Sequence, residues 1–140
     1  MHQSQIQCRV RALDHLVLTV ANIPETVRFY TQVLGMRGEQ FTVADGSRRW
    51  ALNFGQSKIN LHQKGKEYEP KAAFAAPGTA DLCFLTDASI ADWIAHLETH
   101  QVFIEDGPVA RTGARGPIMS LYVRDPDNNL IEVSVSNPDE

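Results

Sequence analysis

The sequence has few of the features that mark secreted, membrane or nucleic-acid-binding proteins. Its two cysteines, Cys8 and Cys83, lie far apart in the chain and do not form the framework of a disulfide-stabilised protein. No apolar run is long enough to cross a bilayer, and residues 1–11 lack the apolar stretch of a signal peptide. The net charge of −4, from 13 basic and 17 acidic residues, argues against a nucleic-acid surface. We therefore expect a cytoplasmic protein with no membrane or nucleic-acid partner.

The composition favours one folded domain. A chain of 140 residues, 43% of them hydrophobic, can bury a core of its own, so we expect residues 1–140 to form a single domain.

The first half of the chain predicts a strand, a helix and three more strands. Residues 13–20 alternate in polarity as a strand does, and Pro24 suits the first turn of a helix that Gly35 ends. The apolar stripe of this helix consists of Ile23, Val27, Tyr30, Val33 and Leu34. Three further strands are predicted at 36–43, 48–54 and 58–63, joined by short turns.

The second half repeats this order. We predict a strand at 79–86, a helix at 88–100 with Asp87 as its N-cap, and strands at 102–105, 118–123 and 130–135. Residues 107–117 are interpreted as a loop that holds Arg111 and Arg115 between glycines. The connection at 64–78 is long for a compact domain, which favours a lid or an interface loop whose Tyr68 and Phe74 cover a ligand.

The repeat indicates an α+β fold of two βαβββ modules, at about 12–63 and 79–136. Each module forms a half-barrel sheet, and the two polar faces line a shared cavity. Superposing the modules places His15 opposite Asp81, and Asn60 or His62 opposite Glu132. A lone Glu or His in a strand is commonly a solvated residue or one paired to a neighbour, so the hypothesis of a site depends on all of these positions together.

These side chains have the chemistry of a metal site. Imidazole, carboxylate and amide groups suit Zn, Ni, Mn or Fe(II), and the absence of a paired cysteine motif excludes a thiolate site. His15, His62 and Glu132 alternatively make a two-histidine, one-carboxylate set of the kind that holds non-haem iron. The sequence leaves open whether Asn60 or His62 is the second ligand.

Several motifs then resemble a known superfamily. The strand with His15, the helix that contains Phe29-Tyr30, and the residues 125–129 before Glu132 resemble the vicinal oxygen chelate superfamily, which includes glyoxalase I. The more detailed resemblance is to the glyoxalase-domain-containing 5 group, some of whose bacterial members are labelled virulence proteins. It rests on residues 59–62, on Pro77-Gly78 with 81–84, and on 111–114 with 116–118.

The resemblance implies a ligand set and a reaction. His15 and Glu132 match the superfamily's first and last metal ligands, Asn60 stands where glyoxalase I has a glutamate, and Asp81 stands where a histidine is usual. In a glyoxalase reaction the metal holds two adjacent substrate oxygens and stabilises an enediolate, while Glu132 moves the proton.

Two arginines and a tyrosine in the second half of the chain are candidates to contact a substrate. Arg111 and Arg115 are candidates to clamp an anionic substrate, Tyr122 is a further candidate contact, and solvated arginines are the structural alternative. We expect a glyoxalase-type lyase or isomerase acting on a small oxygenated metabolite, in a homodimer. The alternatives are an Fe(II) ring-cleavage dioxygenase, or a non-catalytic protein that binds a drug or another small molecule.

Overall fold

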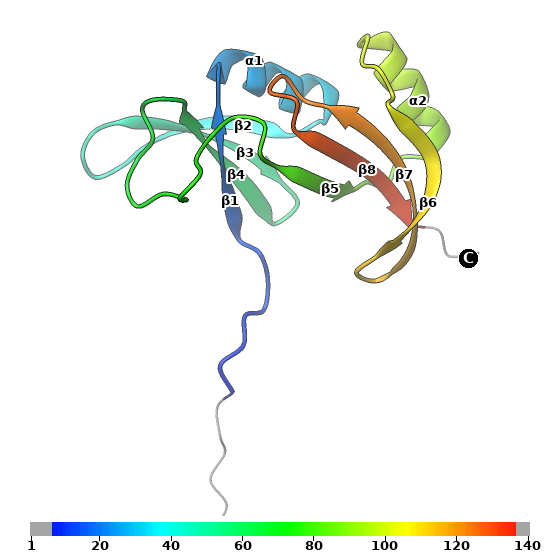
Figure 1. The fold of residues 1–140 in the computed structure, drawn as a ribbon, viewed down its shortest axis with the longest axis horizontal. Helices are drawn as coiled ribbons and strands as arrows, with labels where there is room; N and C mark the ends of the chain where they lie inside the picture. The colour runs from blue at the N-terminus through cyan, green and yellow to red at the C-terminus, as the bar shows by residue number, and fades with distance from the viewer. Residues whose placement is uncertain (1–6, 137–140) are drawn as a thin grey trace, which may run out of the picture.

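The computed structural model describes residues 7–136, which form two four-stranded sheets with a helix on the same side of each (Figure 1). The first sheet has the order β1-β4-β3-β2 and the second the order β5-β8-β7-β6. The first module consists of β1 (His15–Val20), α1 (Ile23–Arg28) with a π-helical turn (Phe29–Val33), β2 (Arg37–Thr42), β3 (Arg48–Phe54) and β4 (Ser57–Gln63). The second consists of β5 (Asp81–Leu85), α2 (Ile90–Thr99), β6 (Asp106–Gly113), β7 (Gly116–Arg124) and β8 (Leu130–Ser136).

The two sheets have the same strand pairing. In each, the first and last strands of the module are parallel neighbours, and the other two strand pairs are antiparallel. A helix follows the first strand and provides the crossover that a parallel pair requires. The predicted α+β fold with two tandem βαβββ modules is therefore confirmed.

Local sequence signals explain where the helices begin and end. The Asn22 side chain accepts a hydrogen bond from the backbone N–H of Glu25 (2.9 Å), Pro24 lies in the first turn, and Gly35 follows the helical segment with φ of +72°. For α2, the prediction that Asp87 is the N-cap is wrong. Ser89 takes this role because its Oγ accepts from the backbone N–H of Asp92 at 3.1 Å, so the helix begins at Ile90.

The prediction of a strand at 102–105 and a loop at 107–117 is also wrong. Residues 102–105 form no strand, and the supposed loop contains β6 and the tight turn that leads into β7. The glycines and prolines of this segment hid its strand character, because such residues usually mark loops. Gly113 and Gly116 instead pair with each other across the ends of a two-residue turn.

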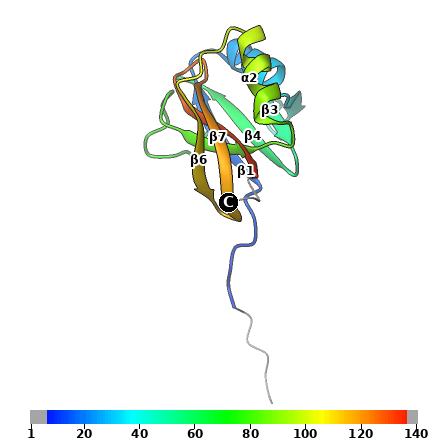
Figure 2. The same ribbon diagram turned by 90° about the vertical axis from the view of Figure 1, so that its right-hand side faces the viewer.

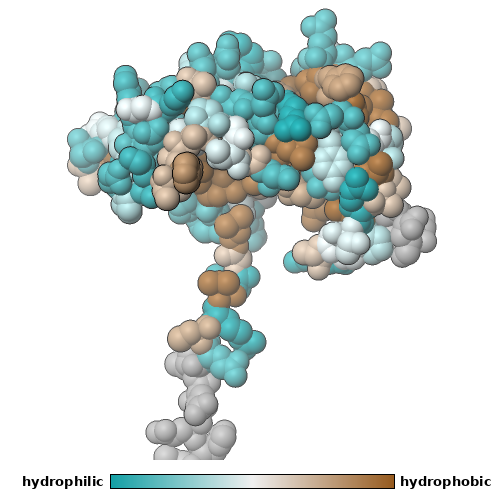
Figure 3. Space-filling model, in the orientation of Figure 1, coloured by the Kyte–Doolittle hydropathy of each residue, from teal (hydrophilic) through white to brown (hydrophobic). Residues whose placement is uncertain are grey.

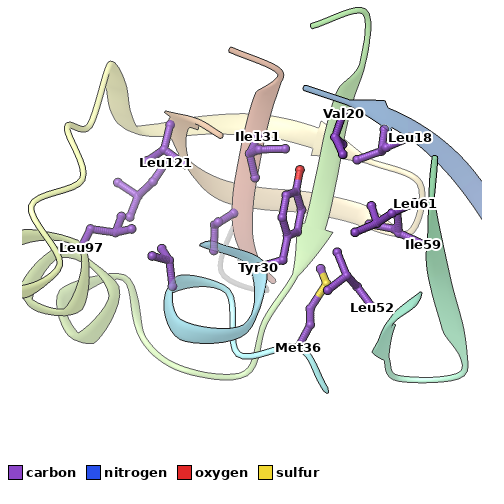
Figure 4. Close-up of a cluster of buried hydrophobic side chains, with 13 residues drawn as sticks. Leu18, Val20, Tyr30, Met36, Leu52, Ile59, Leu61, Leu97, Leu121 and Ile131 are labelled. Carbon is purple, nitrogen blue, oxygen red and sulfur yellow. The ribbon is translucent and has the colours of Figure 1, made fainter. Parts of the chain in front are cut away.

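One hydrophobic core lies between the sheets and the helices, and both modules contribute to it (Figure 4). Tyr30 is fully buried among side chains from the two sheets. Its hydroxyl donates a hydrogen bond of 2.6 Å to Oδ2 of Asp125, in the turn between β7 and β8. The buried members are Leu18, Val20, Tyr30, Val33, Met36, Leu52, Ile59, Leu61, Leu97, Leu121, Val123, Ile131 and Val133.

Residues 7–14, here called the arm, run away from the body of the protein on the side opposite the helices (Figures 1 and 2). Hydrophobic residues occur along the arm among polar ones (Figure 3), and 98% of Val10 and 64% of Leu13 are exposed. Both cysteines, Cys8 in the arm and Cys83 in β5, are free and exposed. No helix within residues 7–136 has the length and hydropathy needed to cross a membrane.

The buried phenol of Tyr30 predicts a loss of stability at alkaline pH. Burial raises the pKa of Tyr30 far above its usual range, and the charge of Asp125 raises it further. The unfolded chain releases this proton near pH 10, so the contribution is fully present below about pH 10 and decreases as the pH rises further. We expect the unfolding free energy, measured with urea between pH 8 and 11, to fall more steeply for the wild type than for Tyr30→Phe. Equal slopes would contradict this account.

Candidate functional site

The sheet faces that point away from the helices carry most of the polar strand residues. Because side chains alternate along a strand, the residues between the core positions of each strand lie on these outer faces. The first polar face consists of His15 and Thr19 (β1), Arg49 (β3), and Asn60 and His62 (β4). The second polar face consists of Asp81 and Cys83 (β5), Ser120 and Tyr122 (β7), and Glu132 and Ser134 (β8).

His15 and Asn60 lie near each other at the exposed end of the first polar face. His15 is the first residue of β1 and is exposed, and its Nδ1 lies 2.8 Å from Oδ2 of Asp14. Asp14 thus holds the imidazole while Nε2 stays available. Asn60 is in register with Val17, two residues after His15, and its Oδ1 is buried with no hydrogen-bond partner within residues 7–136. A histidine and an amide with an unpaired oxygen therefore occupy neighbouring positions on one face.

His62 lies deeper on the same face and is 7% exposed. Its ring packs edge-on against Tyr68 at a centroid distance of 5.2 Å, and its Nδ1 is buried without a hydrogen-bond partner in the described part of the chain. Burial lowers the pKa of His62, the nearby Arg49 lowers it further, and Glu67 has the opposite effect. His62 is therefore neutral at pH 7.

On the second polar face, a chain of hydrogen bonds orients Glu132. Ser120 donates a hydrogen bond of 2.6 Å to Oε2 of Glu132 and also lies 2.7 Å from Oγ of Ser134. Cys83 extends the chain, with its Sγ 3.3 Å from the Ser134 hydroxyl. Burial raises the pKa of the Cys83 thiol, as do the charges of Glu132 and Asp81. The thiol stays protonated at neutral pH and is not an activated nucleophile.

The registers show which positions of the two modules correspond. His15 is in register with Lys58, and Asp81, its counterpart, is in register with Leu130. Asn60 lies two residues beyond Lys58 and Glu132 lies two residues beyond Leu130, so these two positions correspond. His62 and Ser134 each lie two residues further and also correspond. His62 also lies four residues beyond the partner of His15, which separates the two histidines by about 13 Å along the sheet.

The predicted ligands are thus divided between two sheets. His15, Asn60 and His62 lie on the first sheet, and Asp81 and Glu132 lie on the second. Within residues 7–136 of one chain, no three His, Cys, Asp or Glu side chains are grouped so that they could hold one metal ion. A cavity of about 550 Å³ does span both modules, lined by His62, Asp81 and part of the 64–78 connection that includes Phe74.

The predicted substrate residues are also only partly brought together. Arg111 lies on β6 and donates from Nε to the hydroxyl of Tyr122 at 3.0 Å, and its Nη2 is 3.7 Å from Asp106. Arg115 is exposed in the two-residue turn between β6 and β7. Arg111 therefore contacts Tyr122, which is paired in register with Glu132, whereas Arg115 makes no hydrogen bond with these residues.

Two residues near these sites were missed in the sequence, and the contacts of a third, Tyr68, were not predicted. Strand alternation places Arg49 on the first polar face and Ser120 on the second, so the pattern contained a signal for both. Tyr68 belongs to the 64–78 connection, whose path has no sequence pattern, and its contacts with His62 and Arg49 were not predictable.

Comparisons with known proteins find a family and close relatives. The model of the glyoxalase/bleomycin resistance protein/dioxygenase superfamily matches residues 12–133. The glyoxalase domain-containing protein RDO1 of Mycosarcoma maydis is 57% identical over 132 residues, which cover 94% of this chain and 72% of that protein. The virulence protein STM3117 of Salmonella typhimurium is 50% identical over 133 residues, covering 95% of this chain and 90% of that protein.

Solved structures agree with this match. An integron cassette protein from the mobile metagenome of V. cholerae superposes with a TM-score of 0.86 at 53% identity, covering 94% of this chain and all of that one. More distant structures share the fold alone. One is a lactoylglutathione lyase from Agrobacterium tumefaciens, with a TM-score of 0.66 and 21% identity, covering 91% of this chain and 96% of that one. Another is an antibiotic-binding protein, TnmS3, from a Streptomyces species, with a TM-score of 0.72 and 17% identity, covering 94% of this chain and all of that one.

Proposed function

Because the chain belongs to the glyoxalase/bleomycin resistance protein/dioxygenase superfamily, we propose that it is a metal-dependent, glyoxalase-type lyase or isomerase. It acts in the cytoplasm on a small oxygenated metabolite, and its two free cysteines fit that location. The observation that carries the proposal is the pair of complementary half-sites. One holds a buried amide oxygen without a partner beside a histidine, and the other holds a carboxylate fixed by a serine.

The residues present fit a divalent metal. His15 and Asn60 offer a nitrogen and an oxygen, and Asp81 and Glu132 offer carboxylates, a set that suits Zn, Ni, Mn or Fe(II). We assign Asn60 rather than His62 to this set, because Asn60 corresponds to Glu132 in the second module. The contact between His15 Nδ1 and the Asp14 carboxylate, and the hydrogen bond that Ser120 donates to Glu132, are outer hydrogen bonds of the kind that metal ligands usually have.

The proposed site is completed by a second copy of the chain. The first polar face and its neighbours in register carry Arg37, Arg49 and Lys58 against Glu39, whereas the second polar face and its neighbours in register carry Asp81, Asp106 and Glu132 against Arg111. Exposed apolar side chains, Val17 at 45% and Leu85 at 64%, lie on the same two faces. Charge and apolar surface both favour a homodimer in which the first polar face of one copy packs against the second polar face of the other.

Glu132 is the residue proposed to move the proton. Ser120 orients the carboxylate through Oε2, so Oε1 would hold the metal in the absence of substrate and, with substrate bound, would take a proton from the carbon beside a substrate carbonyl and return it to the neighbouring carbon. The bound metal supplies stabilisation of the negative charge that develops on the substrate oxygens. Tyr122, which is in register with Glu132 and bound to Arg111, lines the same face for substrate contact.

The geometry is less favourable to the dioxygenase alternative. A two-histidine, one-carboxylate iron site needs His15 and His62 on one ion. Strand side chains stand roughly perpendicular to the sheet, so two imidazoles about 13 Å apart along it do not converge on one ion with metal bonds of about 2.1 Å. A lyase or isomerase reaction therefore suits these residues better than ring cleavage. If the protein binds no metal, sequestration of a ligand becomes the better explanation.

The test is the metal content of the protein purified without chelators, beside the same measurement for Glu132→Ala. We expect about one metal per site in the wild type and loss of most of it in Glu132→Ala, because a ligand is removed. Ser120→Ala keeps the carboxylate and removes its donor, so we expect its metal affinity to be about 10- to 100-fold lower.

The control is Glu98→Ala, which removes an exposed carboxylate from α2 and is expected to keep full metal content. A wild-type protein that purifies without metal and takes up none when divalent ions are added would refute the catalytic proposal, and a binding protein would then be the better explanation.

A further inference from the structure

Arg49 on the first polar face has an unusual environment for an arginine. Its guanidinium carbon lies 3.5 Å from the centroid of the Tyr68 ring, so the group is stacked flat on the aromatic face. Its Nε is buried and has no hydrogen-bond partner within residues 7–136, and no ion pair of these residues includes Arg49. The side chain is thus held in place while its hydrogen-bond donors stay unused.

His62 lies directly beside Arg49. Trp50 of β3 is in register with Leu61 of β4, so the next pair in this antiparallel ladder is Arg49 and His62, on the polar face. Tyr68 touches both, because its ring also meets His62 edge-on. The Nδ1 atom of His62 is a second buried polar atom without a partner in the described chain. Two neighbouring side chains therefore present unpaired polar atoms in one place.

Nearby acidic groups do not neutralise this cation. Glu67 is the carboxylate whose charge acts on His62, and it accepts a hydrogen bond from the backbone N–H of Gly65 at 2.7 Å. Asp45 is the carboxylate whose pKa the charge of Arg49 lowers, and it binds the backbone N–H of Ser47 at 2.8 Å. Leaving a partly buried guanidinium unpaired costs free energy unless a ligand compensates it.

We infer that Arg49, held flat against Tyr68, forms an oxyanion subsite with His62 that binds a carboxylate or phosphate group. This inference rests on the proposed function in one respect, since it makes the anion part of that enzyme's substrate. The planar guanidinium suits either group through paired N–H donors. His62 lies two residues beyond Asn60 on β4, about 7 Å along the strand. The substrate is then a short acid whose oxygenated carbons lie near Asn60 and whose anionic group lies beside Arg49.

This assignment differs from the sequence-based prediction for the anion clamp. Arg111 already contacts Tyr122 and Asp106, and Arg115 lies in an exposed turn. Arg49 makes no ion pair within residues 7–136, and the stack on Tyr68 fixes the plane of its guanidinium. A fixed donor loses less conformational entropy on binding an anion than a free arginine does.

The experiment measures anion binding by titration calorimetry with metal-free protein at constant ionic strength. The probes are malonate and inorganic phosphate, and the uncharged malonamide is the control ligand. We expect the wild type to bind at least one of the two anions and not malonamide, and Arg49→Ala to weaken that binding at least about tenfold. The matched control is Arg48→Ala, which removes the same charge from the adjacent, exposed position on the opposite face of β3 and should change the Kd little.

Two further variants guard against misfolding of Arg49→Ala. Arg49→Lys keeps the charge without the planar fork, and Tyr68→Leu keeps Arg49 without the stack, so both should bind the anion more weakly than the wild type and unfold near its temperature. The inference is overturned if neither anion binds in an Arg49-dependent manner, or if Arg48→Ala weakens binding as much as Arg49→Ala. Because the titration excludes metal, a protein that never binds metal can still pass this test, and one that binds metal can still fail it.

Discussion

Replacing Asp125 with alanine is expected to lower the free energy of unfolding by about 3–5 kcal/mol. Asp125 is 4% exposed and accepts four hydrogen bonds: one of 2.6 Å from the Tyr30 hydroxyl, one of 2.9 Å from the backbone N–H of Asp127, and two of 2.8 and 2.9 Å from the side chain and backbone of Asn129. The change leaves these donors without an acceptor in a region that excludes water. Denaturant unfolding followed by circular dichroism measures the effect.

A double variant separates the buried hydroxyl from the rest of the network. Tyr30→Phe removes one donor and is expected to cost about 1 kcal/mol by itself. In the Asp125→Ala background the same change removes a buried hydroxyl that has lost its acceptor, so it should cost less or even restore stability. If the two single effects simply add, the hydrogen bond between Tyr30 and Asp125 does not couple them as described.

Gly107→Ala is expected to destabilise the protein by about 3 kcal/mol or more. Gly107 has φ of +106°, and a Cβ placed there would overlap the backbone oxygen of Ser120 and lie 3.0 Å from Cα of Leu121. The unfavourable backbone conformation costs about 1–3 kcal/mol, and the displacement of β7 adds a similar amount. Since Ser120 holds Glu132, we also expect the proposed metal site to bind more weakly in this variant.

The matched control for Gly107→Ala is Gly46→Ala. Gly46 has φ of +84° with no atom within 4 Å of an added Cβ, so this change tests the backbone cost without the clash. We expect it to cost about 1–2 kcal/mol. Thermal unfolding of both variants measures the difference, and a Gly107→Ala protein no less stable than Gly46→Ala would show that β7 moves to make room.

Most of the fold was predictable because its signals are local. The alternation in β3 and β8 and the helical stripe around Tyr30 gave the two modules and their order, and Gly35 gave the end of the first helix. The errors lie where local signals mislead. Gly113 and Gly116 look like loop residues but terminate a hairpin, and Ser89 rather than Asp87 reaches the first free N–H groups of α2.

The candidate site was less accessible to sequence reasoning. Alternation identified the faces that carry His15 and Glu132, but not the relative position of the two sheets, which depends on packing across the whole core. Our proposal of Asn60 rather than His62 as a ligand needed the register of β1 against β4, because residues two apart in one strand share a face. The stack of Arg49 on Tyr68 brings a strand and a long connection together and has no sequence signature.

The hydrogen bond between Tyr30 and Asp125 joins residues 95 positions apart in the sequence. The backbone N–H of Ala21 donates a hydrogen bond to the Asp127 side chain, 106 positions further along the chain. During synthesis, the amino-terminal half of the chain therefore leaves the ribosome long before the acceptor for its buried phenol exists. We therefore expect the first module to stay incompletely folded, with apolar surface exposed, until residue 125 and the strands beside it have been synthesised. A chain interrupted before residue 125 is expected to be more sensitive to proteolysis than the full chain.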